Sequence, residues 1–268
     1  MKAIINADDF CMREGVTNAI ADAFDRRLIT QTTAMVNMPY FSESIQIASN
    51  RGFFDRIGLH LNLTFGMPLT GKVRKCRRIC NSDGSFSGEF HRSFMSRLYL
   101  SQEEKMALAE EIEAQMSRFV SAGLSLMHLD SHHHVHTDWS VLGVVLPLAQ
   151  KFGFKTIRLS RNAGSGLTTI KQLNKAIINA RIKQMFASSA YFTDVVGCKM
   201  ISKIKSSDVV EIMAHPTYWQ NGDFSHYVAS GDMYDWHTPV CTLEALLKET
   251  KGDMELITYK DLLKYDGR

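Results

Sequence analysis

Residues Met127 to Asp138 read MHLDSHHHVHTD and hold five of the chain's ten histidines within nine positions. Imidazole nitrogens and carboxylate oxygens are common ligands of zinc and other divalent metals. A surface tract of histidines is the alternative interpretation. Asp130 and the apolar run from Leu126 to Leu129 argue against it, because together they are typical of a buried strand that ends in polar residues. The segment therefore predicts a metal site, in which not all five histidines can be ligands.

Polar residues of similar kinds stand in or just after four further predicted strands. They are Asn6, Asp8 and Asp9 after the strand Ala3–Ile5, His60 and Asn62 in the strand Ile57–Leu63, Arg158 in the strand Thr156–Leu159, and His215 after the strand Val209–Met213. The carboxyl ends of the strands in a parallel barrel meet at one face, where active sites are built. We therefore expect these side chains to converge with Asp130 and His132.

Two histidines and a carboxylate, with positions left for water, suit zinc. Magnesium, which prefers more oxygen ligands, stays an alternative. A bound metal lowers the pKa of its water from about 15.7 to about 7, and a second carboxylate could take the proton of that water. The adjacent Asp8 and Asp9 could divide these tasks if the backbone turns at the strand end. A histidine from another strand could protonate the leaving group. Metal, base and acid together predict a hydrolase of an amide or an ester.

Each of these residues also has a structural interpretation. An Asp-Asp pair at a strand end usually caps a turn or a helix, and a lone strand histidine such as His60 is more often packed and hydrogen-bonded. His215 before Pro216 is more often structural than catalytic. Four aromatic residues are more often packing than stacked on sugar rings, namely Tyr218, Trp219, Tyr234 and Trp236. Convergence at one face of the barrel favours the functional interpretation of the polar residues.

The elements that must position these residues alternate between strand and helix. Further strands are predicted at Thr32–Val36, Leu126–Leu129 and Glu255–Thr258, and helices at Val16–Leu28, Phe41–Ala48, from Ser101 to Gly123, at Val141–Lys151 and at Lys260–Tyr265. This alternation predicts an α/β fold with parallel strands. No G-x-G-x-x-G follows the first strand, which favours a TIM-like (β/α) barrel, with seven strands or fewer, over an open dinucleotide-binding sheet. Residues 66–100 and 161–205 are predicted to be long insertions of the kind that cover a substrate.

Composition restricts the class of protein. The chain has 268 residues, 45% of them hydrophobic, and a net charge of +3, which gives no argument for nucleic acid. The sequence has no run of 18 consecutive apolar residues, so we expect no membrane span. The five scattered cysteines indicate a reduced, cytoplasmic protein.

The basic run from Lys72 to Arg78 is interpreted as a solvated loop, with a site for an acidic group or a sugar as the alternative. No linker rich in Pro, Gly or Ser interrupts the chain, so we expect residues 1–268 to form one domain.

Four segments together resemble the YdjC-like carbohydrate deacetylases, a family that includes the chitooligosaccharide deacetylases. The segments are NADDF at the first strand, GLHLNLT around His60, HLDSHHHVH around His132 and AHP around His215. The resemblance implies a (β/α)-barrel-like fold and metal-dependent removal of acetyl groups from N-acetylated sugars or oligosaccharides. It also implies that Asp9, His60 and His132 bind the metal. Asp8, or Asp9 itself, would then accept the proton of water, His215 would be the general acid, and Arg158 would hold a catalytic carboxylate in place.

The chain departs from this family at one position, where Cys11 follows Phe10 in place of glycine. Glycine adopts backbone conformations that cysteine resists, so we expect the loop after Phe10 to differ in shape while the chemistry is retained. Two alternatives stay open: a metal-dependent phosphoesterase or other hydrolase on the same barrel, and a non-catalytic metal- or sugar-binding protein. Homo-oligomers are common among cytoplasmic enzymes, and the sequence is compatible with one.

Overall fold

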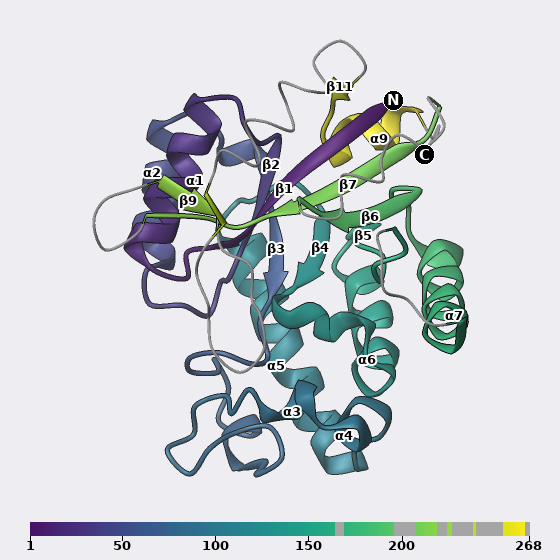
Figure 1. The fold of residues 1–268 in the computed structure, drawn as a ribbon. Coiled ribbons are helices and arrows are strands. Elements are labelled where there is room, and N and C mark those ends of the chain that lie inside the picture. Colours follow the sequence, from purple (N-terminus) through teal and green to yellow (C-terminus); the bar gives the residue numbers. More distant parts are fainter. Residues whose placement is uncertain (164–168, 196–206, 219–223, 227–237, 240–253, 266–268) are drawn as a thin grey trace.

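The computed structural model describes residues 1–163, 169–195, 207–218, 224–226, 238–239 and 254–265. Seven parallel strands form one curled sheet in the order β5-β4-β3-β2-β1-β7-β6. Their bounds are β1 (Lys2–Phe10), β2 (Gln31–Ala34), β3 (Ile57–Leu61), β4 (His128–Ser131), β5 (Thr156–Ile157), β6 (Tyr191–Asp194) and β7 (Val209–Ala214). The sheet has the shape of a half-barrel (Figure 1). The predicted (β/α) barrel-like fold with fewer than eight strands is therefore confirmed.

The two edges of the curled sheet are linked by a parallel bridge between Thr156 of β5 and Ala187, which precedes β6. The short strand β11 (Glu255–Leu256) pairs in parallel with the start of β1. A separate antiparallel sheet is formed by β8 (Pro216–Tyr218), β9 (Phe224–His226) and β10 (Thr238–Pro239). Tyr218 of β8 donates a hydrogen bond to the carboxylate of Asp22, so this small sheet is fixed to the first helix of the chain.

Helices connect the strands and lie around the sheet (Figure 1). Their bounds are α1 (Glu14–Asp25), α2 (Phe41–Asn50), α3 (Glu89–Arg92), α4 (Phe94–Leu98), α5 (Gln102–Ser121), α6 (Trp139–Lys151), α7 (Thr169–Met185) and α9 (Tyr259–Tyr265), with single turns of 3₁₀ helix at Phe54–Arg56 and Val73–Lys75. A capping box opens α5, because Ser101 Oγ accepts from the N–H of Glu104 while the Glu104 carboxylate accepts from the N–H of Ser101. No helix among the described residues has the length and apolar character to cross a membrane.

One prediction about the elements is wrong. Residues 161–205 do not form an insertion alone, because they contain α7 and the barrel strand β6, which pairs with β7 from Tyr191 to Asp194. The helix was missed because its apolar pattern is mixed. Ile178 and Ile182 are buried, but Ile170 and Leu173 are 83% and 64% exposed. An amphipathic helix is recognised by an apolar stripe on one face, and this sequence spreads its apolar residues over both.

The register of the strands sets which residues reach the same end of the sheet. His60 of β3 lies opposite Asp130 of β4, and Ala7 of β1 lies opposite Ala214 of β7. The chain positions after these pairs therefore share the carboxyl end. At the amino end, α9 packs against the sheet through a buried apolar cluster of Ile4, Leu126, Ala187, Ile257, Tyr259 and Leu262. The two ends of the sheet are thus built from different kinds of residue.

Candidate active site

Three side chains from different strands meet at the carboxyl end of the sheet. Nε2 of His60 lies 3.1 Å from Oδ1 of Asp9, and Nδ1 of His132 lies 2.8 Å from the same oxygen. All three side chains are almost completely buried. One ligand atom from each residue lies within 4.8 Å of the other two. The structure therefore brings together the three residues that the resemblance implies as metal ligands.

The backbone of β1 explains how adjacent aspartates reach one site. Neighbouring side chains of a regular strand point to opposite faces. The pairing of β1 with β2 shifts between Ala7 and Phe10, and Asp9 has φ +68°, in the left-handed region. This irregularity turns the strand at its end, so that Asp8 contacts Arg158 after β5 while Asp9 contacts His60 of β3 and His132 after β4. The backbone turn at the end of β1 that lets both aspartates face one site is therefore present.

A hydrogen-bond network orients His60. Its Nδ1 lies 2.7 Å from Oδ1 of Asp130, whose Oδ2 accepts from the hydroxyl of Thr33 at 3.0 Å. A carboxylate behind a metal-ligating histidine is a common arrangement, because it fixes the ring and makes the imidazole more basic. Burial lowers the pKa of His60, but Asp130 and Asp9 outweigh burial and raise it to about 10. A proton must therefore leave His60 before the ring can bind a metal.

The residues fit a divalent metal ion on two observations. The first is the donor set itself, one carboxylate and two imidazoles within reach of a common centre. The second is Nε2 of His132, which is buried without a hydrogen-bond partner among the described residues. A buried polar atom without a partner is energetically costly, and a bound metal ion would give this nitrogen a partner. Burial raises the pKa of Asp9, but His132 and His60 outweigh burial and hold this pKa well below its ordinary value. The carboxylate of Asp9 is therefore ionised.

Asp8 is held beside this triad by Arg158. Two nitrogens of the guanidinium donate to the two carboxylate oxygens of Asp8, Nη1 to Oδ2 at 2.6 Å and Nη2 to Oδ1 at 2.7 Å. Oδ1 also accepts from Nδ2 of Asn6 at 2.8 Å, whereas Oδ2 lies 4.0 Å from Nε2 of His215. Burial lowers the pKa of His215, although Asp8 and Asp9 oppose this effect. The four residues named for catalysis from the sequence therefore surround one site.

His128 of β4 and His136 after it have structural contacts. His136 is fully buried between Ser131 Oγ, 2.5 Å from its Nδ1, and the carbonyl oxygen of Arg158, 3.0 Å from its Nε2. His128 stacks on the ring of Tyr259, with ring centroids 3.8 Å apart. Burial is the main reason that the pKa of His128 falls to about 3 and that of His136 to about 4. Both rings are therefore neutral at pH 7. Neither belongs to the group formed by Asp9, His60 and His132.

His133 and His134 adopt an unusual backbone conformation. Their φ angles are +54° and +57°, in the left-handed region that non-glycine residues seldom occupy. Nδ1 of His133 lies 2.9 Å from the hydroxyl of Thr64, and its ring stacks on His91 with centroids 4.2 Å apart. His134 packs edge-on against Phe192. Since His91 belongs to α3, the predicted insertion 66–100 reaches the edge of the site.

Cys11 adopts the conformation that a glycine would favour. Its φ is +74°, and its side chain is fully buried. That the loop after Phe10 differs in shape from that of the family stays a prediction. The chain tolerates a left-handed cysteine, which costs on the order of 1 kcal/mol. The buried side chain belongs to the main hydrophobic core.

Sequence reasoning missed two residues beneath the site. Glu211 is fully buried in β7, and its Oε1 accepts from Nε of Arg158 at 2.7 Å. Its Oε2 accepts from the hydroxyl of Tyr259 at 2.6 Å. Burial raises the pKa of Glu211 to about 7, although Arg158 and Tyr259 oppose it. The available signal was a glutamate inside the apolar run VVEIMA, since a carboxylate in a buried strand needs a partner.

The basic run and Tyr218 contact residues outside the ligand triad. In the basic run, Lys72 pairs with Glu110 and Arg78 with Glu104, and the charged side chains are exposed, in agreement with a solvated loop. Of the four aromatic residues considered for sugar stacking, Tyr218 contacts Asp22. The other three, Trp219, Tyr234 and Trp236, lie outside the described residues.

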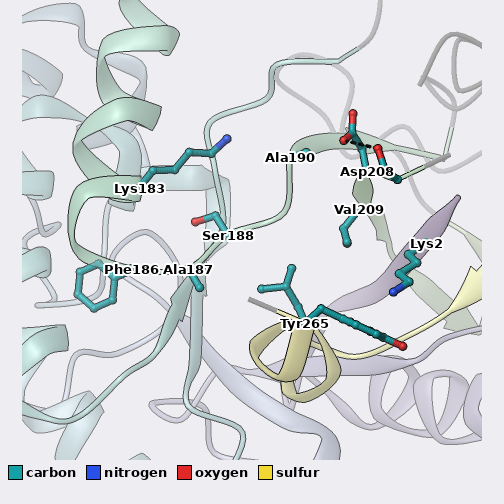
Figure 2. A pocket seen from close by; sticks show the side chains of 11 residues that line it. Lys2, Lys183, Phe186, Ala187, Ser188, Ala190, Asp208, Val209 and Tyr265 are labelled. Carbon is teal, nitrogen blue, oxygen red and sulfur yellow. Dashed lines mark hydrogen bonds between the residues drawn. The ribbon is translucent and has the colours of Figure 1, made fainter. Parts of the chain in front are cut away.

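A cavity of about 430 Å³ lies at the opposite, amino end of the sheet. Figure 2 shows Lys183 and Ser188 on one side of it and Lys2 and Tyr265 on the other. Lys2 and Val209 are the first residues of β1 and β7, which fixes the position of the cavity in the fold. None of the site residues predicted from the sequence lines it. This cavity is therefore distinct from the candidate active site.

A family model and curated relatives both match this chain. Residues 2–253 match the family model described as YdjC-like protein. The carbohydrate deacetylase of Brevibacillus brevis is 33% identical over 268 residues, which are 99% of this chain and 94% of the relative. The carbohydrate deacetylase of Halalkalibacterium halodurans is 33% identical over 219 residues, which are 81% of this chain and 86% of the relative.

A solved structure gives the same fold. It is named as a cellobiose-phosphate cleavage protein from Enterococcus faecalis, and it matches with a TM-score of 0.70 at 23% identity. The match covers 97% of this chain and 98% of that chain. At this identity the likeness concerns the fold alone. The family model, in contrast, matches nearly the whole sequence, and the chain belongs to the YdjC-like protein family.

Proposed function

We propose that the protein is a metal-dependent carbohydrate deacetylase that hydrolyses the acetamide of N-acetylated sugars or oligosaccharides and releases acetate. The observation that carries the proposal is the buried convergence of Asp9, His60 and His132 with Asp8 beside them. The names of the Brevibacillus and Halalkalibacterium relatives support the reaction and the class of substrate. The proposed products are acetate and a free amino sugar.

Asp9, His60 and His132 would hold the metal ion, zinc or magnesium. The bound ion would polarise the acetyl carbonyl and lower the pKa of a water molecule. Both histidines face Oδ1 of Asp9, so this carboxylate is engaged by the ligand set. A bound ion would be the common partner of the three side chains.

Asp8 is the better candidate for the proton acceptor. Arg158 fixes the carboxylate in one orientation through two parallel hydrogen bonds, which is the strongest geometry for such a pair. Asp8 thus stays beside the metal site without belonging to the ligand triad. In the proposed reaction, Asp8 takes one proton from the attacking water as the new C–O bond forms.

His215 is the candidate proton donor to the leaving nitrogen. Its Nε2 lies 4.0 Å from Asp8, so acid and base would face the same scissile C–N bond. We expect His215→Gln to lower kcat on an N-acetyl sugar by about a hundredfold. On an aryl acetate, whose leaving group departs without protonation, the loss should shrink to a few-fold. Equal losses on both substrates would contradict the role of general acid.

The test is acetate release from N,N′-diacetylchitobiose by metal-loaded and chelator-treated protein. We expect release only with metal, and a loss of at least a thousandfold in His132→Ala together with weaker metal binding. Lys183→Ala, at the amino end of the sheet, is the matched control and should behave as the unsubstituted protein. If folded, metal-bound protein released no acetate from any acetylated sugar, the proposed reaction would be wrong. Phosphate esters and other esters would then be assayed for the alternative hydrolase.

A further inference from the structure

We infer that Glu211 is a positioning residue for deacetylation, which sets the orientation of Arg158 and, through Arg158, that of Asp8. The inference rests on the proposed function, because it assigns a role within that reaction. Glu211 touches neither the ligand triad nor Asp8 in the described hydrogen bonds. Its shortest hydrogen-bonded path to Asp8 runs through the guanidinium.

The guanidinium of Arg158 is held at two edges. At one edge, Nε donates to Oε1 of Glu211 at 2.7 Å, and at the other, Nη1 and Nη2 donate to the two oxygens of Asp8. The group is planar, so fixing the Nε edge also fixes the direction of the Nη edge. The ring of Phe192, with its centroid 4.7 Å away, packs against the guanidinium carbon. A rotation at Glu211 would therefore move the carboxylate of Asp8.

Charge neutralisation alone does not explain Glu211. Asp8 already neutralises Arg158, and Asp130 lies 2.8 Å from Nη1 as a second carboxylate. A third carboxylate gives the buried cluster an excess of negative charge, which is unfavourable in a medium of low polarity. What Glu211 adds is a hydrogen-bond acceptor for the Nε edge, the edge that Asp8 does not reach. The residue is thus suited to orientation rather than to neutralisation.

Tyr259 at the start of α9 in turn holds Glu211. Its hydroxyl donates to Oε2 of Glu211 at 2.6 Å, and its ring stacks on His128. One hydrogen-bonded path thus runs from Tyr259 through Glu211 and Arg158 to Asp8. A second path runs from the backbone N–H of Tyr259 to Oε1 of Gln31, then through Asn6 to Oδ1 of Asp8. Two hydrogen-bonded paths therefore lead from the first residue of α9 to Asp8. The C-terminal helix contributes to the geometry of the site from beneath it.

The test compares Glu211→Met with Glu211→Gln. Methionine fills the space without accepting from Arg158, whereas glutamine can accept from Nε of Arg158 and donate to the Tyr259 oxygen. We expect Glu211→Met to lower kcat on diacetylchitobiose by about 10- to 100-fold, because small misplacements of a catalytic group have effects of this size. KM and the affinity for Zn²⁺, measured by calorimetry, should change by less than about threefold. Glutamine should restore kcat to within about threefold of the unsubstituted protein.

A double-mutant cycle with Asp8→Asn shows whether Glu211 acts through Asp8. In the Asp8→Asn background, Glu211→Met should cause little further loss of kcat. Tyr259→Phe removes only the hydroxyl and should lower kcat about three- to tenfold with the same non-additivity, which keeps the test decisive if Glu211→Met fails to fold. Unchanged kcat in the single variants, or equal fractional losses in both backgrounds, would overturn the inference. If the unsubstituted protein released no acetate, the proposed function would fail instead.

Discussion

The carboxyl and amino ends of the curled sheet bury different groups. At the carboxyl end and just beneath it, Arg158 and the carboxylates of Asp8, Asp130 and Glu211 are at most 2% exposed. At the amino end, the cavities of about 430 Å³ and 560 Å³ are lined by charged groups such as Lys183 and Lys260, which remain accessible to water. The candidate active site is therefore marked by costly buried charge, and the volume of a surface cavity does not locate it.

Backbone strain follows the same division. Five non-glycine residues with positive φ occur in the described chain. Asp9, Cys11, His133 and His134 lie at the carboxyl end, and Arg27 lies near the amino end before β2. Strained conformations persist only where the surroundings over-determine them, and they cluster at functional sites. Strain and buried charge thus point to the same end of the sheet.

The largest expected difference between the two ends concerns catalysis. Asp8→Asn removes the proposed proton acceptor, so we expect kcat for acetate release to fall by about 10² to 10⁴. KM and Zn²⁺ affinity should stay within about threefold, because Asp8 is outside the ligand triad. Lys183→Ala should leave kcat unchanged. A comparable loss in Lys183→Ala would break the comparison, since the amino end would then take part in the reaction.

The two ends should also differ in stability. Arg158→Met leaves the carboxylates of Asp8, Asp130 and Glu211 buried without their cation, so we expect the free energy of unfolding to fall by about 3–5 kcal/mol. The matched change is Lys260→Met, because Lys260 lies 3.3 Å from Asp55 with side chains 38% and 64% exposed. Its cost should stay below about 1 kcal/mol, since exposed ion pairs contribute little. Urea denaturation measures both, and similar costs would contradict the contrast in burial.

Much of the carboxyl end could be predicted from the sequence because its residues are marked locally. Asp9, His60, His132 and His215 each interrupt or follow an apolar run, and parallel strands bring such positions to one face whatever their order. The contacts of Arg158 with Glu211 and Asp8 join residues 53 and 150 positions apart. They depend on the strand order, in which β7 lies beside β1, and strand alternation alone leaves that order open.

The elements that were missed share a physical cause. In β6 only Phe192 and Thr193 are strongly buried, and α7 has exposed apolar residues on the face opposite its core contacts. Hydrophobic periodicity reports burial on one face, so it fails where the exposed face is also apolar. The conformation of Cys11 has a different cause. Local preference predicts avoidance of positive φ, whereas the tertiary structure imposes it.

Cys11 also gives the smallest of the expected effects. Cys11→Ala removes the sulfur but keeps a side chain at φ +74°, whereas Cys11→Gly removes the sulfur and the strain together. Glycine costs unfolded-state entropy, but relief of a left-handed conformation outweighs this cost, so we expect glycine to be more stable than alanine by about 1 kcal/mol. Urea denaturation of the two variants isolates this difference, because both lack the thiol. Acetate release should be equal in both, since Asp8 and Asp9 keep their partners. A more stable alanine variant would mean that packing, and not backbone strain, dominates at this position of the carboxyl end.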